Sequence, residues 1–182
     1  MPWVIVGIVI VLLLIYFLII RDNKNESELI NPTSENSHRS VNENISTVAA
    51  YVSFVENNKE KMGLDHSYTN EALLKLIDAT NAIAAEVGFE VGADLENVRE
   101  YANRIKEDQL ETKHADNIRK ADDILTTVLQ NIQKTKFPKL ANEVAELKVA
   151  SESIRPDVLA LDQKDAIKNY FAKAAALLQK MN

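Results

Sequence analysis

The sequence predicts an all-α protein in three parts: one transmembrane helix at 3–20, a flexible polar linker at 21–42, and an antiparallel up-and-down helical bundle at 43–182. Two observations support this prediction. An uncharged apolar run occupies the first part, and in the last part apolar residues recur at alternating intervals of three and four, which is the period of packed helices. Six such stretches predict five to six bundle helices, and we find no segment with the every-second-residue alternation of a strand.

The first element is an 18-residue run, 3–20, without a charged or amide side chain and with Tyr16 as its only hydroxyl. As a helix rising ~1.5 Å per residue it covers about 27 Å, close to the ~30 Å hydrocarbon core of a bilayer. Trp3 and Tyr16 fit the aromatic belts of the two interfaces, and Arg21 and Lys24 would lie among the headgroups. The run lacks a positive leading segment and a small-residue cleavage site, so we expect an uncleaved signal anchor that contacts the lipid bilayer.

Charges near this run favour one orientation of the single-pass protein. Arg21 and Lys24 follow the run and Arg39 lies farther along, which favours a cytoplasmic bundle because Lys and Arg are retained on that side. The excess is small, so an extracytoplasmic bundle stays open. The chain contains no cysteine, which excludes lipidation at cysteine, disulfides and thiolate metal sites.

The linker, 21–42, is rich in Asn and Ser, carries Pro32 in its middle and has one apolar pair, Leu29-Ile30. So little apolar surface cannot offset the entropy lost on ordering. We expect a flexible tether with a root-mean-square reach of about 25 Å.

The bundle helices follow in order, each defined by its predicted core positions. They are Ile45, Val48, Val52, Val55 and Met62; Leu73, Leu76, Thr80, Ile83 and Val87; Leu95, Val98, Ala102 and Ile105; Ile118, Ala121, Leu125, Val128 and Ile132; Leu140, Val144, Leu147, Ser151 and Ile154; and Ile167, Tyr170, Ala174, Leu177 and Met181.

Helix-breaking residues separate these stretches. Gly63 follows the first stretch, Gly88 and Gly92 divide the second from the third, and Pro138 and Pro156 precede the last two. Connections this short make neighbouring helices antiparallel, and a mean spacing of 3.5 favours crossing angles near +20°.

One motif suggests metal chemistry. Glu111 and His114 form Glu-x-x-His in line with core positions of the fourth bundle helix, as in di-iron or di-manganese bundles, and His66 lies similarly ahead of the second helix. A di-metal site also needs inward carboxylates on two further helices, which the core positions lack, and the second copy, Glu35 with His38, falls in the linker. We therefore expect no metal site and place His114 at the solvated end of the bundle.

Other catalytic patterns are weaker. Nucleophilic catalysis needs a serine, threonine or cysteine beside a base, but the serines gather in the linker and no cysteine is present. The pair Asp122-Asp123 is interpreted as a solvated helix face, and Asp65-His66 as loop residues. The sequence predicts no catalytic residue and no cofactor, and a di-metal carboxylate protein or another enzyme is kept as an alternative.

Charge and surface residues favour a binding or scaffolding role without enzymatic activity. The net charge of −6 argues against nucleic acid, which would require a basic surface. Tyr51 and Phe54 flank the first set of core positions, so they either widen the buried stripe, which we favour, or form a partner-facing edge. We expect a protein partner or self-association, and an extracytoplasmic ligand-sensing bundle is the alternative. Abundant Asn, Lys and Ile indicate a bacterial, AT-rich genome.

Overall fold

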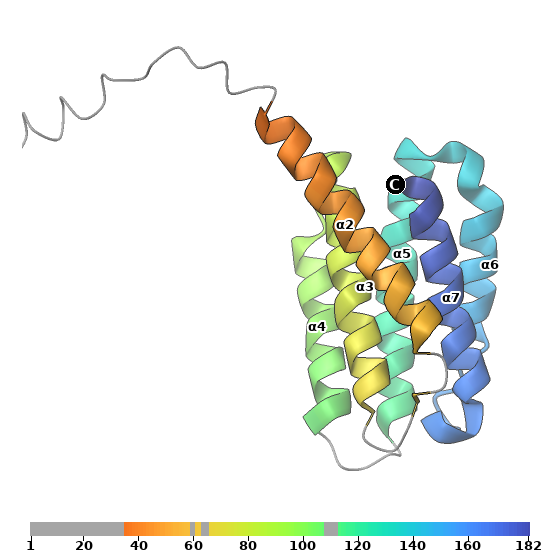
Figure 1. The fold of residues 1–182 in the computed structure, drawn as a ribbon. Helices are drawn as coiled ribbons and strands as arrows, with labels where there is room; N and C mark the ends of the chain where they lie inside the picture. Colours follow the sequence, from red (N-terminus) through yellow and green to blue (C-terminus); the bar gives the residue numbers. More distant parts are fainter. Residues whose placement is uncertain (1–34, 59–60, 63–65, 108–112) are drawn as a thin grey trace, which may run out of the picture. The chain divides into compact units, whose positions relative to one another are not determined.

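The computed structural model describes residues 35–58, 61–62, 66–107 and 113–182 of the chain. From Arg39 to Asn182 the protein forms one compact unit. Every regular element in the described residues is helical, and the helices pack as a bundle (Figure 1). The all-α prediction and the helical bundle are confirmed.

The described residues hold six α-helices and two short 3-10 helices. In chain order they are α2 (Glu35–Asn57), α3 (Ser67–Glu86), α4 (Gly92–Glu107), α5 (His114–Lys136), η2 (Pro138–Leu140), α6 (Ala141–Glu152), η3 (Ala160–Gln163) and α7 (Lys164–Met181).

Each of α3 to α6 packs against the next helix along the chain. In addition, α3 contacts both α5 and α7, so these five helices enclose a shared core. Figure 1 shows α3 to α7 side by side with alternating direction, while α2 crosses them at an angle. The order from α3 to α7 is that of an up-and-down bundle.

The predicted core positions are the residues that the bundle buries. All of them are buried except Ile45, Val87 and Leu140. Val87 and Leu140 are half-buried and pack against the core, whereas Ile45 is exposed near the start of the described side chains of α2. The three-and-four spacing therefore located the inward face of every helix.

The α3–α4 connection needs the predicted glycine. Gly88 has a φ of +66°, which side chains with a Cβ rarely adopt. Its N–H donates to the Ala85 carbonyl at 3.2 Å, and the N–H of Phe89 donates to the Ala84 carbonyl at 2.8 Å. These two bonds satisfy carbonyls at the end of α3, and Phe89 packs on the core beside them.

Two predictions concern the start of the chain. The transmembrane helix at 3–20 and the linker residues 21–34 lie outside the described residues. Among the helices of the described residues, none combines the length and the apolar character needed to cross a bilayer. Residues 35–42, which the sequence assigned to the linker, are instead the first turns of α2. The physical reason is that lengthening an existing helix costs far less than nucleating one, so the packed part of α2 extends into polar sequence.

Candidate functional site

Asp122 is the least expected side chain of the core, because it is a carboxyl group with 0 % of its surface exposed. It lies on α5, which packs against α3, α4 and α6. Beside the predicted core positions, α5 buries a second stripe that includes Ala115, Asp122 and Leu129 at seven-residue intervals. Our interpretation of Asp122-Asp123 as a solvated face is therefore wrong for Asp122, and only Asp123 is exposed.

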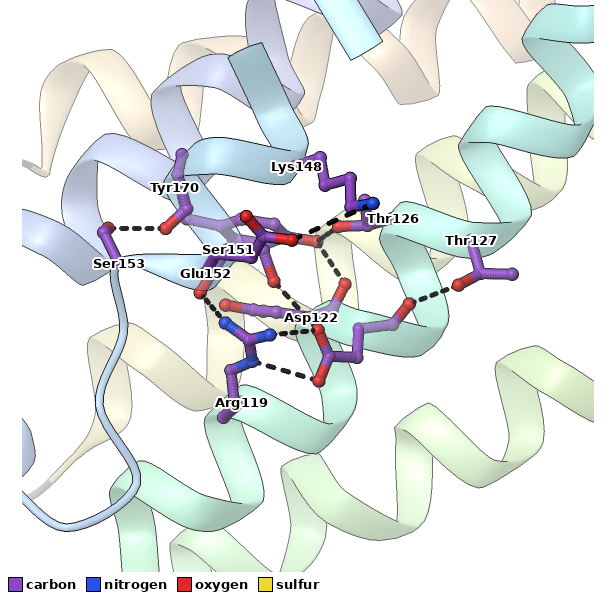
Figure 2. Close-up of polar contacts among 11 residues, drawn as sticks. Arg119, Asp122, Thr126, Thr127, Lys148, Ser151, Glu152, Ser153 and Tyr170 are labelled. Atoms are coloured by element: carbon purple, nitrogen blue, oxygen red, sulfur yellow. Dashed lines mark hydrogen bonds and ion pairs between the residues drawn. The ribbon is translucent and has the colours of Figure 1, made fainter. Parts of the chain in front are cut away.

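The Tyr170 hydroxyl of α7 lies beside Asp122 (Figure 2), and the Tyr51 hydroxyl of α2 lies near it. The Tyr170 hydroxyl of α7 donates to the backbone carbonyl of Asp122 at 3.2 Å, and the Thr126 hydroxyl lies 3.5 Å from the Tyr170 hydroxyl. On α2, Tyr51 is fully buried and donates to the backbone carbonyl of Phe171 at 2.9 Å. Among the described residues neither carboxyl oxygen of Asp122 has a hydrogen-bond partner. Each of these hydroxyls therefore forms a hydrogen bond with a backbone carbonyl or with another hydroxyl, and none bonds to the Asp122 carboxyl group.

Burial controls the electrostatics of this cluster. It raises the pKa of Asp122 well above its usual value, the neighbouring charge of Asp123 raises this pKa further, and Arg119 opposes both effects. Burial also raises the pKa of Tyr170, with a smaller contribution from Asp122. For Tyr51 burial again raises the pKa, followed by the effects of Tyr68 and Asp122. The environment favours the protonated, uncharged form of Asp122.

A charged network next to this cluster joins α5 to the end of α6 (Figure 2). The Arg119 guanidinium contacts both carboxylate oxygens of Asp123, at 3.0 Å and 2.9 Å, and donates to the Ser151 carbonyl near the last turn of α6. The Ser151 hydroxyl donates to Asp123 at 3.3 Å. A cation there complements the α6 dipole, and the contacts direct Arg119 toward Asp123.

Five surface grooves on the described residues lie elsewhere, and Asp122 is in the lining of none of these five. A buried acid can exchange a proton but cannot meet a substrate without a conformational change. The arrangement therefore suits a group that makes stability depend on pH.

His66 and His114 meet at one end of the bundle. Their ring centroids are 3.9 Å apart, at an interplanar angle of 67°, and the two residues are 6 % and 1 % exposed. The placement of His114 at a solvated end, and of His66 in a solvated loop, is wrong. His66 directly precedes α3, and His114 is the first residue of α5. These two helices run in the same direction (Figure 1), so their packed ends bring the two rings together.

The rest of the predicted metal motif is only partly described. Glu111 lies outside the described residues, and so does Asp65. Glu35 and His38 lie on α2. Within the described ranges no group of three or more His, Asp or Glu side chains is placed to hold a metal ion.

No family model, curated protein or solved structure matches this chain.

Tyr51 and Phe54 prove to be parts of the core. Tyr51 is fully buried, and Phe54 is half-buried with its ring stacked on Tyr68 at a centroid distance of 5.6 Å. The Lys75 ammonium lies 5.5 Å from the Phe54 ring centroid. The burial interpretation is confirmed for Tyr51, and Phe54 packs at the edge of the same cluster.

The most exposed large apolar side chain among the described residues is Val149 on α6, at 66 %. It borders a groove between α6 and α7, whose lining is Ala145, Glu146, Val149, Ala150, Asn169 and Lys173. Ala141 and Ala145, also exposed, precede Val149 at four-residue intervals on the outer face of α6. This face was not predicted because the three-and-four spacing marks only inward positions. The available signal was a set of apolar residues between the core positions of α6.

Proposed function

We propose that this chain is a membrane-anchored helical module that acts by binding a protein partner. The anchor would be the helix at 3–20, with the bundle on the cytoplasmic side as Arg21 and Lys24 favour. The groove beside Val149 is the observation that carries the binding role, because it combines an exposed apolar side chain with polar groups at its border. Val149 borders one of five surface grooves on the described residues, whereas Asp122 is in the lining of none of these five, which supports a binding role.

The anchor is tested by extraction. The full chain should stay in the membrane fraction after an alkaline carbonate wash, because an 18-residue apolar helix is stable only in lipid. The double change Leu13→Arg and Leu14→Arg should release it, since each arginine at the helix centre costs roughly 2.5 to 3.5 kcal/mol of insertion. Leu159→Arg, at an exposed leucine of the bundle, is the matched control and should remain in the pellet. Release of the unchanged chain would contradict the anchor.

The binding role is tested by photocrosslinking in native membranes. A photoreactive residue at the exposed Ala145 position should give a discrete crosslinked protein, and Val149→Asp should reduce its yield at least tenfold, because a carboxylate in an apolar contact loses its hydration. Asn103→Asp, on the exposed side of α4, is the control and should leave the yield unchanged. Thermal unfolding should be nearly the same in both variants. Equal yields with and without Val149→Asp would exclude this groove.

A further inference from the structure

We propose that α2 is a proton-dependent strap, which packs over α3, α5 and α7 while the Asp122 carboxyl is protonated and separates from them when it ionises. Such a strap would act whether or not the chain is anchored in a membrane or binds a partner at the groove beside Val149. The buried acid has no part in that binding role.

The charged groups nearest to Asp122 bond to each other or to α6. On its own helix, Asp122 has Arg119 and Asp123 as charged neighbours, and the guanidinium is held by Asp123 and the Ser151 carbonyl. From α6, the Ser151 hydroxyl faces Asp123. No hydrogen bond or ion pair among the described residues joins a cation to the Asp122 carboxyl. A carboxylate formed there is a buried charge with no partner, which is strongly unfavourable.

Neutral hydroxyl groups approach the acid from other helices. These are Tyr170 from α7 and Tyr51 from α2, with Tyr68 of α3 beside Tyr51. Tyr170 and Tyr51 already donate to backbone carbonyls. Solvating a carboxylate with either hydroxyl would break one of these hydrogen bonds. The Tyr68 hydroxyl has no hydrogen-bond partner among the described residues, but it interacts with Tyr51 and not with Asp122, so full solvation of the carboxylate requires water. Water can reach the carboxylate only if a covering helix moves.

Of these helices, α2 is the least firmly packed. In its described side chains α2 buries a single narrow stripe, Val48, Tyr51, Val52 and Val55, and exposes most of the rest. In contrast, α3 and α7 bury broad faces, and they contact each other directly. Because α2 is the first helix of the compact unit, its departure leaves the connections among α3 to α7 intact (Figure 1). Of α2, α3 and α7, the helices that contribute the three tyrosines, α2 is therefore held by the smallest buried face.

Proton linkage gives the size of the effect. In the separated state the carboxyl is hydrated and titrates near its ordinary pKa of about 3.9. In the packed state burial raises this pKa. Between the two values the ratio of separated to packed molecules should rise up to about tenfold for each pH unit, because the separated state loses a proton that the packed state retains. Rising pH therefore favours separation.

The chain has no cysteine, so spin labels can be placed at chosen positions of the full-length protein. One pair, Ser53→Cys on α2 with Ala172→Cys on α7, reports the strap, and the pair Glu71→Cys on α3 with Ala172→Cys reports the remaining bundle; all three positions are exposed. Pulsed electron paramagnetic resonance between about pH 5 and pH 9 should show the α2–α7 distances lengthening and broadening as pH rises. The α3–α7 distances should stay constant.

The variant Asp122→Asn tests whether ionisation of Asp122 causes the lengthening, because an amide cannot ionise. In this variant the α2–α7 distances should stay short at every pH. Asp123→Asn, which removes the exposed neighbouring acid, should retain the pH response. Three results would overturn the proposal: α2–α7 distances that do not change with pH, the same lengthening in Asp122→Asn, or simultaneous lengthening of both pairs, which would mean unfolding of the whole bundle.

Discussion

Asp122→Asn should raise the thermal stability of the full chain at about pH 8 and change it little at about pH 4. In the folded protein burial raises the pKa of Asp122, whereas in the unfolded chain the carboxyl titrates near its ordinary value. Above about pH 4 the unfolded chain loses this proton and the folded chain retains it. The contribution of Asp122 to stability is thus fully present at low pH and is lost as pH rises through its folded pKa.

The expected size follows from the same linkage. Between the pKa of Asp122 in the unfolded chain and its higher pKa in the folded protein, the free energy of unfolding of the unchanged protein falls by about 1.4 kcal/mol per pH unit relative to Asp122→Asn. For a domain of this size each kcal/mol corresponds to a shift of roughly 2 to 6 °C in Tm. Asparagine is close to aspartic acid in volume, so the packing around Tyr51 and Tyr170 should survive. The difference between the two Tm values, followed by circular dichroism over the pH series, is the quantity to compare.

Asp78→Asn is the matched control, because Asp78 is an exposed acid on α3 with its side chain 60 % accessible. Surface changes of this kind usually alter stability by less than about 0.5 kcal/mol. Its Tm should follow that of the unchanged protein at every pH. A Tm difference between Asp122→Asn and the unchanged protein that stays constant across the pH series would contradict the raised pKa of Asp122.

The fold was largely predictable because helices that pack side by side must bury one stripe each. On α5, for example, Ile118, Leu125 and Ile132 recur at seven-residue intervals, and all three are buried. A stripe depends on the local period of the chain, so the sequence contains it directly. Helix ends were predictable for the same reason where a single residue sets the conformation, as Gly88 does after α3.

The buried acid was not predictable because its burial depends on how many neighbours surround α5. A helix at the edge of a bundle buries one stripe, whereas α5 packs against three other helices and buries a second one. Periodicity alone does not say which helix is central. The available signal was Leu129, an apolar residue outside the predicted core positions and seven residues after Asp122. It marks the second stripe, and with it the inward position of the acid.

The histidine pair illustrates a similar limit. His66 and His114 are 48 residues apart in the sequence and become neighbours only because α3 and α5 begin at the same end of the bundle. Each histidine alone resembles a residue of a solvated helix end. Their burial follows from tertiary packing, which the sequence pattern predicted in outline but not at the level of individual side-chain contacts.

Tyr51→Ala should have the largest effect of any single change on α2, lowering the free energy of unfolding by about 3 to 5 kcal/mol. The side chain is fully buried, and its hydroxyl donates to the Phe171 carbonyl of α7 at 2.9 Å. Truncation removes the ring and leaves a cavity beside Asp122. Tyr51→Phe retains the ring and loses only the hydrogen bond, so we expect a loss of about 1 kcal/mol. Ser53→Ala, at an exposed position of the same helix, should stay close to the unchanged protein.

The position of the denaturation transition also separates the two roles considered for Tyr51. A core residue gives the series Ala, Phe and unchanged protein in order of rising stability, measured by urea unfolding in mild detergent. A partner-facing residue would leave Tm unchanged in Tyr51→Ala while reducing crosslinking to a partner, and that outcome would reject its assignment to the core. Because Tyr51 joins α2 to α7, its truncation should also lengthen the α2–α7 spin-label distances at low pH, where Asp122 is protonated. The Tyr51 ring would then hold α2 against α7, and ionisation of Asp122 would release it, so the two residues would affect the same helix contact independently.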